Sequence, residues 1–308
     1  MRHTLYLSFS EARFVLLFLT AAFSFLQVAQ SQVPVSYHAV PLTTEKSLSV
    51  QLDLGTLKLQ LGSQSTRHAF ECEFHSPDTA SLFLDYAIRE NVGYLSLQHK
   101  EVSEEPRRRR IRLDWRSLFG GDEPEEDTPR RSRLKLLLPS DIPVRLDFSV
   151  GAGHNDLDMS GLKVSELSLT AGACATKLRF SVPNPIPMKK LHISAGASKL
   201  MVEGLGNANF EEMEFNGGAS DVTLDFSGSE IRSSKVNISI GAGSVRILLP
   251  KHAGVKIKYN DNFFSSLKLP DDFTQDGDWF YSGNFSQVKG VLEMHVSSGV
   301  GSVRMRWK

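Results

Sequence analysis

The sequence predicts an all-β protein: a β-solenoid of stacked short strands, toastrack-like in layout, with an N-terminal antiparallel β unit. Two observations lead to this prediction. Apolar and polar residues alternate strictly over most of the chain, as in strands with one buried face. A glycine followed by such an alternating run also recurs six times, and the first five copies are spaced by 21, 24, 22 and 23 residues. A unit this short cannot bury its apolar face alone, so neighbouring units must stack.

The chain begins with a predicted signal peptide, residues 1–31. Arg2 and Arg13 give it a basic start, and the uncharged apolar run 14–29 that follows is short for a membrane span. Residues 29–31 form a small-x-small cleavage site, with an uncleaved anchor as the alternative. No later stretch approaches ~18 uninterrupted apolar residues. We therefore expect an exported protein, in the periplasm, at the cell surface or secreted, whose mature chain does not span a membrane.

Two stretches separate this segment from the repeats. Residues 42–103 contain the alternating run 47–61 and three shorter predicted strands, which we interpret as the N-terminal antiparallel β module. Residues 104–133 hold eight acidic and nine basic residues, with a short predicted strand at 111–115. The near balance of charge favours a solvated loop over a basic patch for phosphate or anionic lipid.

Residues 134–308 form the glycine-punctuated β-repeat domain. At a tight corner the chain needs a positive φ or a close backbone approach, and glycine allows both. Even offsets from each glycine are mostly apolar, with polar entries in the first two repeats, and predict an inward column; odd offsets predict the outer surface. No Gly-Lys-Ser/Thr and no helical pattern follows, which argues against a phosphate loop. The structural glycines are Gly151, Gly172, Gly196, Gly218, Gly241 and Gly299.

Charged residues at odd offsets allow two interpretations. Asp158, Arg179 and Glu203 are expected on successive coils about 4.8 Å apart, where opposite signs would form a ladder that fixes the register. The alternative is a carbohydrate-active site, with carboxylates converging in a groove. Its candidates are Asp156, Asp158 and Glu203, with His154. Alternation of sign favours the ladder, because a catalytic pair needs two adjacent carboxylates.

The two cysteines, Cys72 and Cys174, exclude a disulfide scaffold and a cysteine-rich zinc site. A single disulfide between them stays open, as does burial of two free thiols. The histidines show no metal-binding spacing, and the acidic turns at 260–262, 271–272 and 276–278 suit Asx turns better than calcium. We expect no metal, no cofactor and no catalytic residue.

The C-terminal run 299–307 repeats the pattern of the earlier coils. It places Val303, Met305 and Trp307 inward and Arg304 and Arg306 outward. We expect this run to be the last coil, with the tryptophan covering the end of the apolar column, because an open solenoid end would expose strand edge and core.

Five short motifs follow one another in a fixed order: LDLGTLKL at 52–59, GYLSL at 93–97, VGAG at 150–153, LDMSGL at 157–162 and IGAGSV at 240–245. In this order they resemble the bacterial toastrack-type cell-envelope families, which include LiaF-like cell-wall-active-antibiotics-response proteins and adhesin-like β-solenoid proteins. The resemblance covers nearly the whole mature chain. It implies a right-handed stack of short strands in the cell envelope and no catalytic residue. LiaF-like regulators carry membrane helices before this module, whereas this chain carries a predicted signal peptide.

Three functions follow from these features. The favoured one is a non-enzymatic envelope protein, structural or adhesin-like, that offers a rigid β surface to a partner protein or a cell-surface glycan. The resemblance also implies an envelope-stress accessory protein that acts through a partner, and the carboxylates allow a carbohydrate-active enzyme. Lys+Arg and Asp+Glu both number 35, so the chain has no net charge and is not expected to bind nucleic acid.

Overall fold

The computed structural model describes most of the chain from Val35 onward, namely residues 35–65, 67–76, 81–100, 132–229, 232–260 and 265–308. The predicted signal peptide 1–31 lies outside the described residues, as does nearly all of the charged stretch 104–133 with its short strand. Val35–Lys308 forms one compact unit. The described residues contain no helix long and apolar enough to cross a bilayer.

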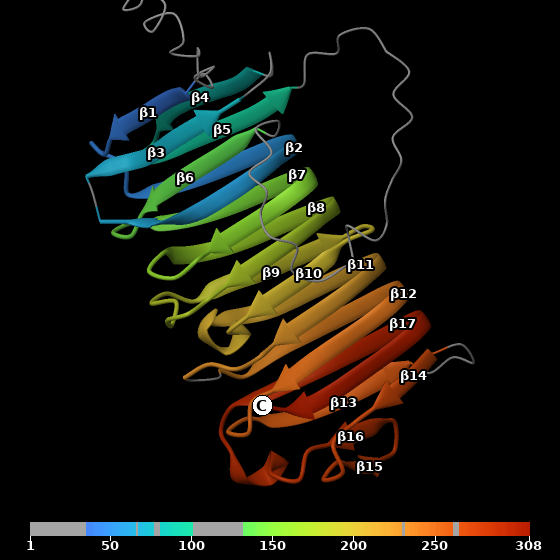
Figure 1. The fold of residues 1–308 in the computed structure, drawn as a ribbon. Coiled ribbons are helices and arrows are strands. Elements are labelled where there is room, and N and C mark those ends of the chain that lie inside the picture. Colours follow the sequence, from blue (N-terminus) through green and yellow to red (C-terminus); the bar gives the residue numbers. More distant parts are fainter. Residues whose placement is uncertain (1–34, 66, 77–80, 101–131, 230–231, 261–264) are drawn as a thin grey trace, which may run out of the picture. The chain divides into compact units, whose positions relative to one another are not determined.

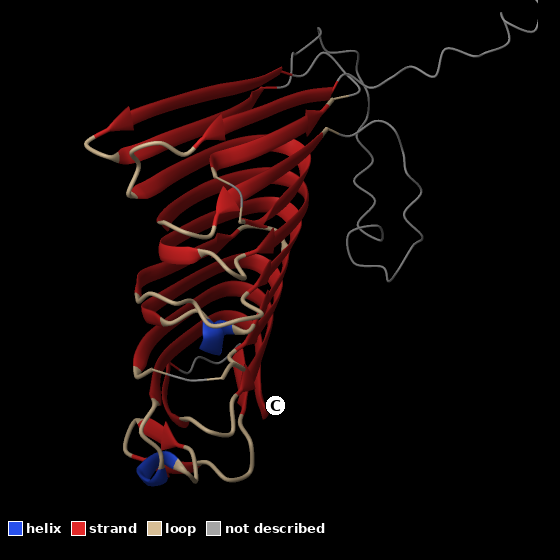
Figure 2. Ribbon diagram, turned by 90° about the vertical axis from the view of Figure 1, so that its left-hand side faces the viewer, coloured by secondary structure: helices blue, strands red, loops and turns tan. Residues whose placement is uncertain are grey.

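Strands account for most of the described residues of this unit, and two 3-10 helices are the other regular elements among them (Figures 1 and 2). The strands of the N-terminal half are β1 (Val35–Pro41), β2 (Ser47–Gln64), β3 (His68–His75), β4 (Ser81–Arg89), β5 (Val92–Lys100), β6 (Arg133–Pro139), β7 (Pro143–Asp158) and β8 (Lys163–Arg179). Those of the C-terminal half are β9 (Met188–Ala195), β10 (Lys199–Glu203), β11 (Phe210–Asp225), β12 (Ser234–Leu249), β13 (Gly254–Asn260), β14 (Ser265–Lys268), β15 (Thr274–Asp276), β16 (Trp279–Tyr281) and β17 (Val291–Trp307). The 3-10 helices are η1 (Leu205–Asn207) and η2 (Phe285–Gln287).

Long parallel strands form the rungs of a stack. They follow one another in the order β2, β7, β8, β11, β12 and β17, with one rung between β8 and β11 divided into β9 and β10 (Figure 1). The first halves of these strands pair with one another and form one face, and the second halves form the other. At the ends of the stack, β5 and β6 continue the two faces beyond β2, and β13 and β14 continue them beyond β17. The predicted β-solenoid of stacked strands is therefore confirmed.

Antiparallel pairing occurs at both ends of this stack. β4 pairs with β5, and β3 pairs with both β6 and β1, so the N-terminal end carries the predicted antiparallel strands. At the other end, β16 pairs with β13 and β15. One element differs from the prediction. β2, which the sequence grouped with the antiparallel strands of 42–103, pairs in parallel with β5, β6 and β7 and is the first rung of the stack.

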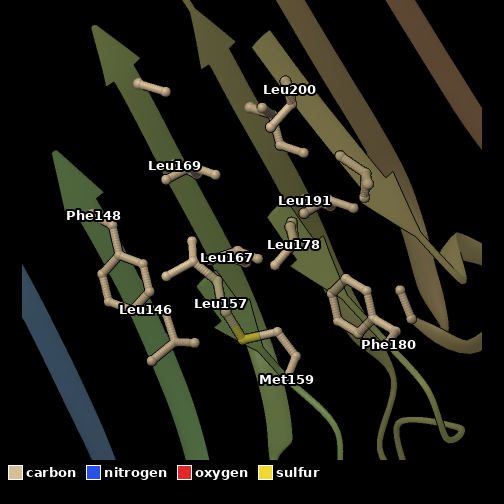
Figure 3. Packing of buried hydrophobic residues seen from close by; sticks show 14 of the residues in the cluster. Leu146, Phe148, Leu157, Met159, Leu167, Leu169, Leu178, Phe180, Leu191 and Leu200 are labelled. Carbon is tan, nitrogen blue, oxygen red and sulfur yellow. The ribbon is translucent and has the colours of Figure 1, made fainter. Parts of the chain in front are cut away.

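Side chains at the even offsets from each glycine point into the stack, as predicted. The column at offset six is at most 2% exposed on every rung, because it meets equivalent residues of the rungs on either side (Figure 3). It consists of Leu157, Leu178, Val202, Leu224, Ile247 and Met305. The polar entries of the first two repeats satisfy each other: Asn155 Nδ2 donates to Thr176 Oγ1 at 3.0 Å inside the core. This bond avoids the cost of burying two unpaired polar groups.

The corner glycines allow successive rungs to approach closely. A Cβ built on Gly172 would lie 2.6 Å from the carbonyl oxygen of Gly151, and one on Gly299 would lie 2.5 Å from that of Gly241. A Cβ built on Gly196, Gly218 or Gly241 would lie 3.1–3.2 Å from the carbonyl oxygen of the preceding glycine in the set. A Cβ on Gly151 would lie 3.1 Å from the carbonyl oxygen of Gly55 in β2. Positive φ is found instead two residues later on three rungs, at Gly153, Gly243 and Gly301. Close approach therefore explains the recurring first glycine, and Gly55 is a member of the column that the spacing did not reveal.

The prediction that 299–307 is the last coil is wrong. β17 pairs with β12 on one side and with β13 and β14 on the other, so strands that precede it in the sequence lie beyond it in the stack. Val303 and Met305 are buried and Arg304 and Arg306 are exposed, as expected. Trp307 is only half-buried and packs against Phe273, with ring centroids 5.7 Å apart, so it does not cover the end of the column.

A buried carboxylate anchors the N-terminal end of the stack. Glu45 is 6% exposed, and it accepts hydrogen bonds from the Tyr86 hydroxyl and from the backbone and hydroxyl of Thr43. Burial acts to raise the pKa of Glu45, but the hydrogen bonds from Tyr86 and Thr43 outweigh it and leave the pKa below its ordinary value. Burial and the neighbouring carboxylate both raise the pKa of Tyr86, so the phenol stays a donor.

Gly172→Ala should destabilise the stack, because its methyl group would meet a backbone oxygen that cannot move without shifting a rung. We expect the free energy of unfolding to fall by about 1–3 kcal/mol. Gly62→Ala is the matched control, since its Cβ would meet only a leucine methyl at 3.6 Å. Urea denaturation measures both, and equal midpoints for the two variants would contradict the close-approach explanation.

Glu45 should make stability depend on pH in the acidic range. Because its folded pKa is lowered, its contribution is complete above the unfolded pKa, near 4.5, and is lost as pH falls through the folded pKa. Glu45→Gln should flatten the decline in unfolding free energy between neutral and acidic pH, whereas Asp53→Asn, at an exposed position of β2, should leave that decline unchanged. Denaturation at several pH values tests this, and parallel pH profiles for wild type and Glu45→Gln would refute it.

Candidate binding site

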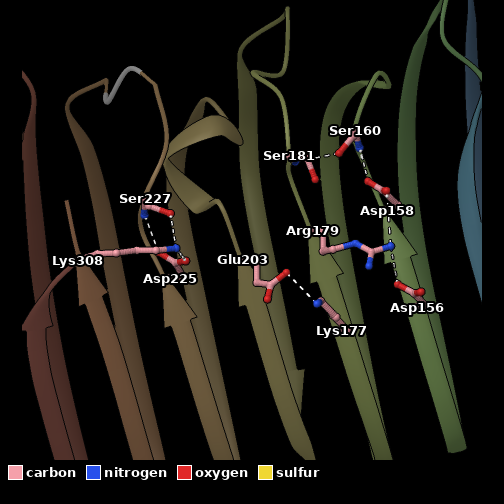
Figure 4. A network of polar contacts seen from close by, with 10 residues as sticks. All are labelled: Asp156, Asp158, Ser160, Lys177, Arg179, Ser181, Glu203, Asp225, Ser227 and Lys308. Atoms are coloured by element: carbon pink, nitrogen blue, oxygen red, sulfur yellow. Dashed lines mark hydrogen bonds and ion pairs between the residues drawn. The ribbon is translucent and has the colours of Figure 1, made fainter.

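The carboxylates predicted as an alternative catalytic set are held by cations (Figure 4). Arg179 lies opposite Asp158 and Glu203 on the neighbouring strands. Its Nη2 is 2.9 Å from Asp156 Oδ1 and 3.6 Å from Asp158 Oδ2, and Lys177 Nζ is 3.0 Å from Glu203 Oε2. The predicted order of opposite charges on successive strands is therefore confirmed, but Glu203 pairs with Lys177 and not with Arg179.

His154, the fourth member of the predicted set, lies on β7 two residues before Asp156, and the next strand presents Ala175 opposite it. The structure thus places His154, Asp156 and Asp158 on β7, and Glu203 two strands away on β10. The three carboxylates engage Arg179 and Lys177 of β8, the strand between them, instead of converging on a shared groove.

Charge matching continues on the other face of the stack. One column of outward residues there alternates in sign over seven neighbouring strands, and its ion pairs include Arg145 to Glu166 at 3.2 Å and Lys256 to Glu293 at 2.7 Å. The hydrogen bond from Lys256 is the main reason that the pKa of Glu293 is lowered. In stack order the column is Arg145, Glu166, Lys190, Glu212, Lys235, Glu293 and Lys256.

One column breaks this rule near the C-terminal end. Arg246 of β12, Arg304 of β17 and Lys268 of β14 occupy matching positions on three neighbouring strands, so three cations stand side by side. Like charges directly opposite each other destabilise a sheet. Arg246 Nη1 donates weakly to Thr223 Oγ1 at 3.4 Å. Among the described residues, no carboxylate lies at ion-pair distance from any of the three.

A groove of about 850 Å³ opens beside this column. β14 pairs with β17 only as far as Arg304, after which the chain leaves through Pro270, while β17 continues to Trp307. The groove occupies the side of β17 that β14 no longer covers. Its lining residues are Lys251, Lys268, Leu269, Pro270, Asp271, Asp272, Asn284, Arg304, Met305, Arg306 and Trp307. We call this region the basic groove.

The basic groove combines fixed positive charge with an apolar strip. Lys251 and Arg306 join the cations of the column, and both are exposed. Trp307 provides the aromatic surface: its indole N–H donates to Asp272 Oδ1 at 2.8 Å, which fixes the orientation of the ring. Guanidinium groups bind carboxylates and phosphates through paired hydrogen bonds. This arrangement can hold an anionic ligand that also has an apolar surface.

The sequence analysis assigned Arg304 and Arg306 only to the solvent face. A signal was present, because Arg246 and Arg304 share the same offset from their glycines and thus predict a repeated charge. Lys268 could not have been found in this way. Its position depends on the pairing of β14 with β17, which no local pattern shows.

The cysteines form no disulfide, and the described acidic turns form no metal site. Cys72 and Cys174 are both buried as free thiols, so the open question of a disulfide is settled against it. Burial raises the pKa of Cys72 to about 12. Asp278 pairs with Lys258 at 2.9 Å, and 261–262 lie outside the described residues. In the described part of the chain, no group of three or more histidine, cysteine and acidic side chains is arranged to hold a metal.

Comparison with known proteins identifies a family and several distant structures. A family model described as the N-terminal domain of toast_rack matches residues 29–184 and 180–248. A "putative cell adhesion protein" from Clostridium sporogenes is 16% identical, with a TM-score of 0.43, over 90% of this chain and 100% of that one. A "putative adhesin" from Bacteroides fragilis is 10% identical, with a TM-score of 0.33, over 89% of this chain and 97% of that one. No curated protein matches the sequence.

Removing a cation from the like-charged column should stabilise the protein. At low ionic strength, Arg304→Gln should raise the free energy of unfolding by about 0.2–1 kcal/mol, because it relieves repulsion from both neighbouring strands. Arg179→Gln, which removes a cation paired with two carboxylates, should lower it by up to about 1 kcal/mol. High salt should shrink both effects. Urea denaturation at low and high ionic strength measures them, and a loss of stability in Arg304→Gln would contradict unrelieved repulsion.

Proposed function

The chain belongs to the toast_rack family by its N-terminal domain, and from this premise we propose that it is an exported cell-envelope protein that acts as a non-enzymatic binding module. The basic segment and apolar run of residues 1–31 support export. The stack of rungs supports a binding role, because its packed core holds an extended surface in one conformation.

The observation that carries the proposal is the unpaired cationic column. In the columns that contain Arg179 and Glu293 the outward charges alternate, and each pair lowers the electrostatic energy. Arg246, Arg304 and Lys268 gain no such stabilisation from one another, and two of them, Arg304 and Lys268, line the basic groove. A binding surface explains this exception, because a ligand of opposite charge supplies the missing partner.

The arrangement of the carboxylates supports binding over hydrolysis. A glycosidase needs two carboxyl groups on either side of the scissile bond. Asp156 and Asp158 flank a single guanidinium instead, and Glu203 is paired with Lys177. These carboxylates stabilise the register of the stack.

The purified chain, immobilised and exposed to extracts of the cell envelope, should retain a component that salt elutes. Reversing two charges in the basic groove, Arg304→Glu with Arg306→Glu, should reduce the retained amount at least tenfold. Lys46→Glu, an exposed cation outside the groove, is the matched control and should retain as much as wild type. Equal retention by wild type and the double variant would reject the groove as the binding surface.

A further inference from the structure

We propose that the basic groove binds an anionic glycan, a sugar chain that carries carboxylate groups. This proposal rests on the binding role proposed above and assigns the chemical class of the ligand. Three features of the groove lead to it: the spacing of the cations, the apolar strip beside them, and the acidic side chains among them.

The cations are spaced as a polymer of charged sugars requires. Neighbouring strands of a sheet lie about 4.7–4.9 Å apart. Arg304 and Lys268 in the groove, and Arg246 on the next strand beside it, therefore present one positive charge at each such step. That step is close to the length of one pyranose unit in an extended chain. A polymer of uronic acids that runs across the strands therefore has a repeat similar in length to that of the cations, so carboxylates along the chain can reach them.

The apolar strip fits the carbon–hydrogen face of a sugar ring. Trp307 is half-buried, backed by Phe273, and oriented by the bond from its indole N–H to Asp272. Leu269 and Pro270, both half-buried, continue the strip along the groove. An aromatic ring held in this way presents a large, rigid contact area at little entropic cost. A flexible acidic peptide or an inorganic anion would not need it.

The carboxylates of the groove separate a sugar from other polyanions. Asp271 and Asp272 both line it and are exposed. Their charge repels a nucleic acid or a polyphosphate, which carries an anion at every unit and few free hydroxyls. A sugar chain offers hydroxyl groups that donate to these carboxylates while its own carboxylates bind the cations. The mixture of both signs in one groove matches a ligand that has both kinds of group.

Binding of four defined probes to the purified chain tests the proposal. Tryptophan fluorescence and calorimetry should show that polygalacturonate binds and that its affinity falls steeply with salt. Methyl-esterified polygalacturonate, which lacks the charge but keeps the sugar, should bind at least tenfold more weakly. Poly-L-glutamate carries carboxylates but no sugar ring, and single-stranded DNA carries phosphates in place of carboxylates. Each should also bind at least tenfold more weakly than polygalacturonate.

Point variants then locate the site. Arg304→Glu and Lys268→Glu should each weaken polygalacturonate binding at least tenfold, and Lys46→Glu should leave it unchanged. Arg304→Glu places a carboxylate between two cations, so it should keep the fold, which a thermal melt verifies. Asp271→Asn decides the role of the acidic side chains. It should weaken binding if they accept sugar hydroxyls, and it should strengthen binding if they merely repel a polyanion.

The outcomes separate the ligand class from the binding role. Equal affinity for the esterified polymer, tighter binding of poly-L-glutamate or DNA, or stronger binding by Asp271→Asn would overturn the assignment to an anionic glycan. Groove-dependent retention of an envelope component would still stand in each case. If the wild-type chain retained no envelope component and bound none of the four probes, the binding role itself would be overturned.

Discussion

The structure depends on how closely the backbones of successive rungs approach at their corners. At Gly172 and Gly299 the space that a Cβ would fill lies within 2.6 Å of the preceding glycine's oxygen, so only a residue without a side chain allows the strand to bend there. Because each long strand bends at the same place, its two halves nest on the two halves of the next. The bends thus define both faces of the stack and hold the strands in a common register.

The common register turns each offset from the glycine into a column. Apolar columns bury one another, and outward columns bring charges of successive rungs side by side, as for Asp158, Arg179 and Glu203. Individual exposed pairs contribute little to stability. Their effect lies in register, because a shifted rung would lose every pair of a column at once. A column of like charge is stable only because the apolar columns behind it already fix the strands.

Local patterns explain which parts could be predicted. Alternation and the recurring glycine are properties of single rungs, so the strands, the inward columns and the ladder at Arg179 could be derived from sequence. The position of β2 as the first rung of the stack could not be predicted, because Gly55 and Gly151 are 96 residues apart and the strands between them obscure the repeat. The basic groove was missed for a similar reason: it forms where β14 stops pairing with β17, and this depends on contacts distant in sequence. Trp307 fitted the repeat, but the chain between β12 and β17 supplies Phe273, its packing partner.

The insertion of β17 between β12 and the β13–β14 pair has a consequence for folding order. Rungs β7 to β12 can be added one after another as the chain emerges, each closing a loop of about the same length. β13 and β14 emerge next, but in the final stack their parallel partner is β17, which is synthesised later. β13 and β14 cannot form their parallel pairs until β17 has been synthesised, and until then the edge of β12 stays unpaired and can bind other strands. The basic groove is therefore assembled last, so a nascent chain acquires its proposed binding surface only when the stack is complete.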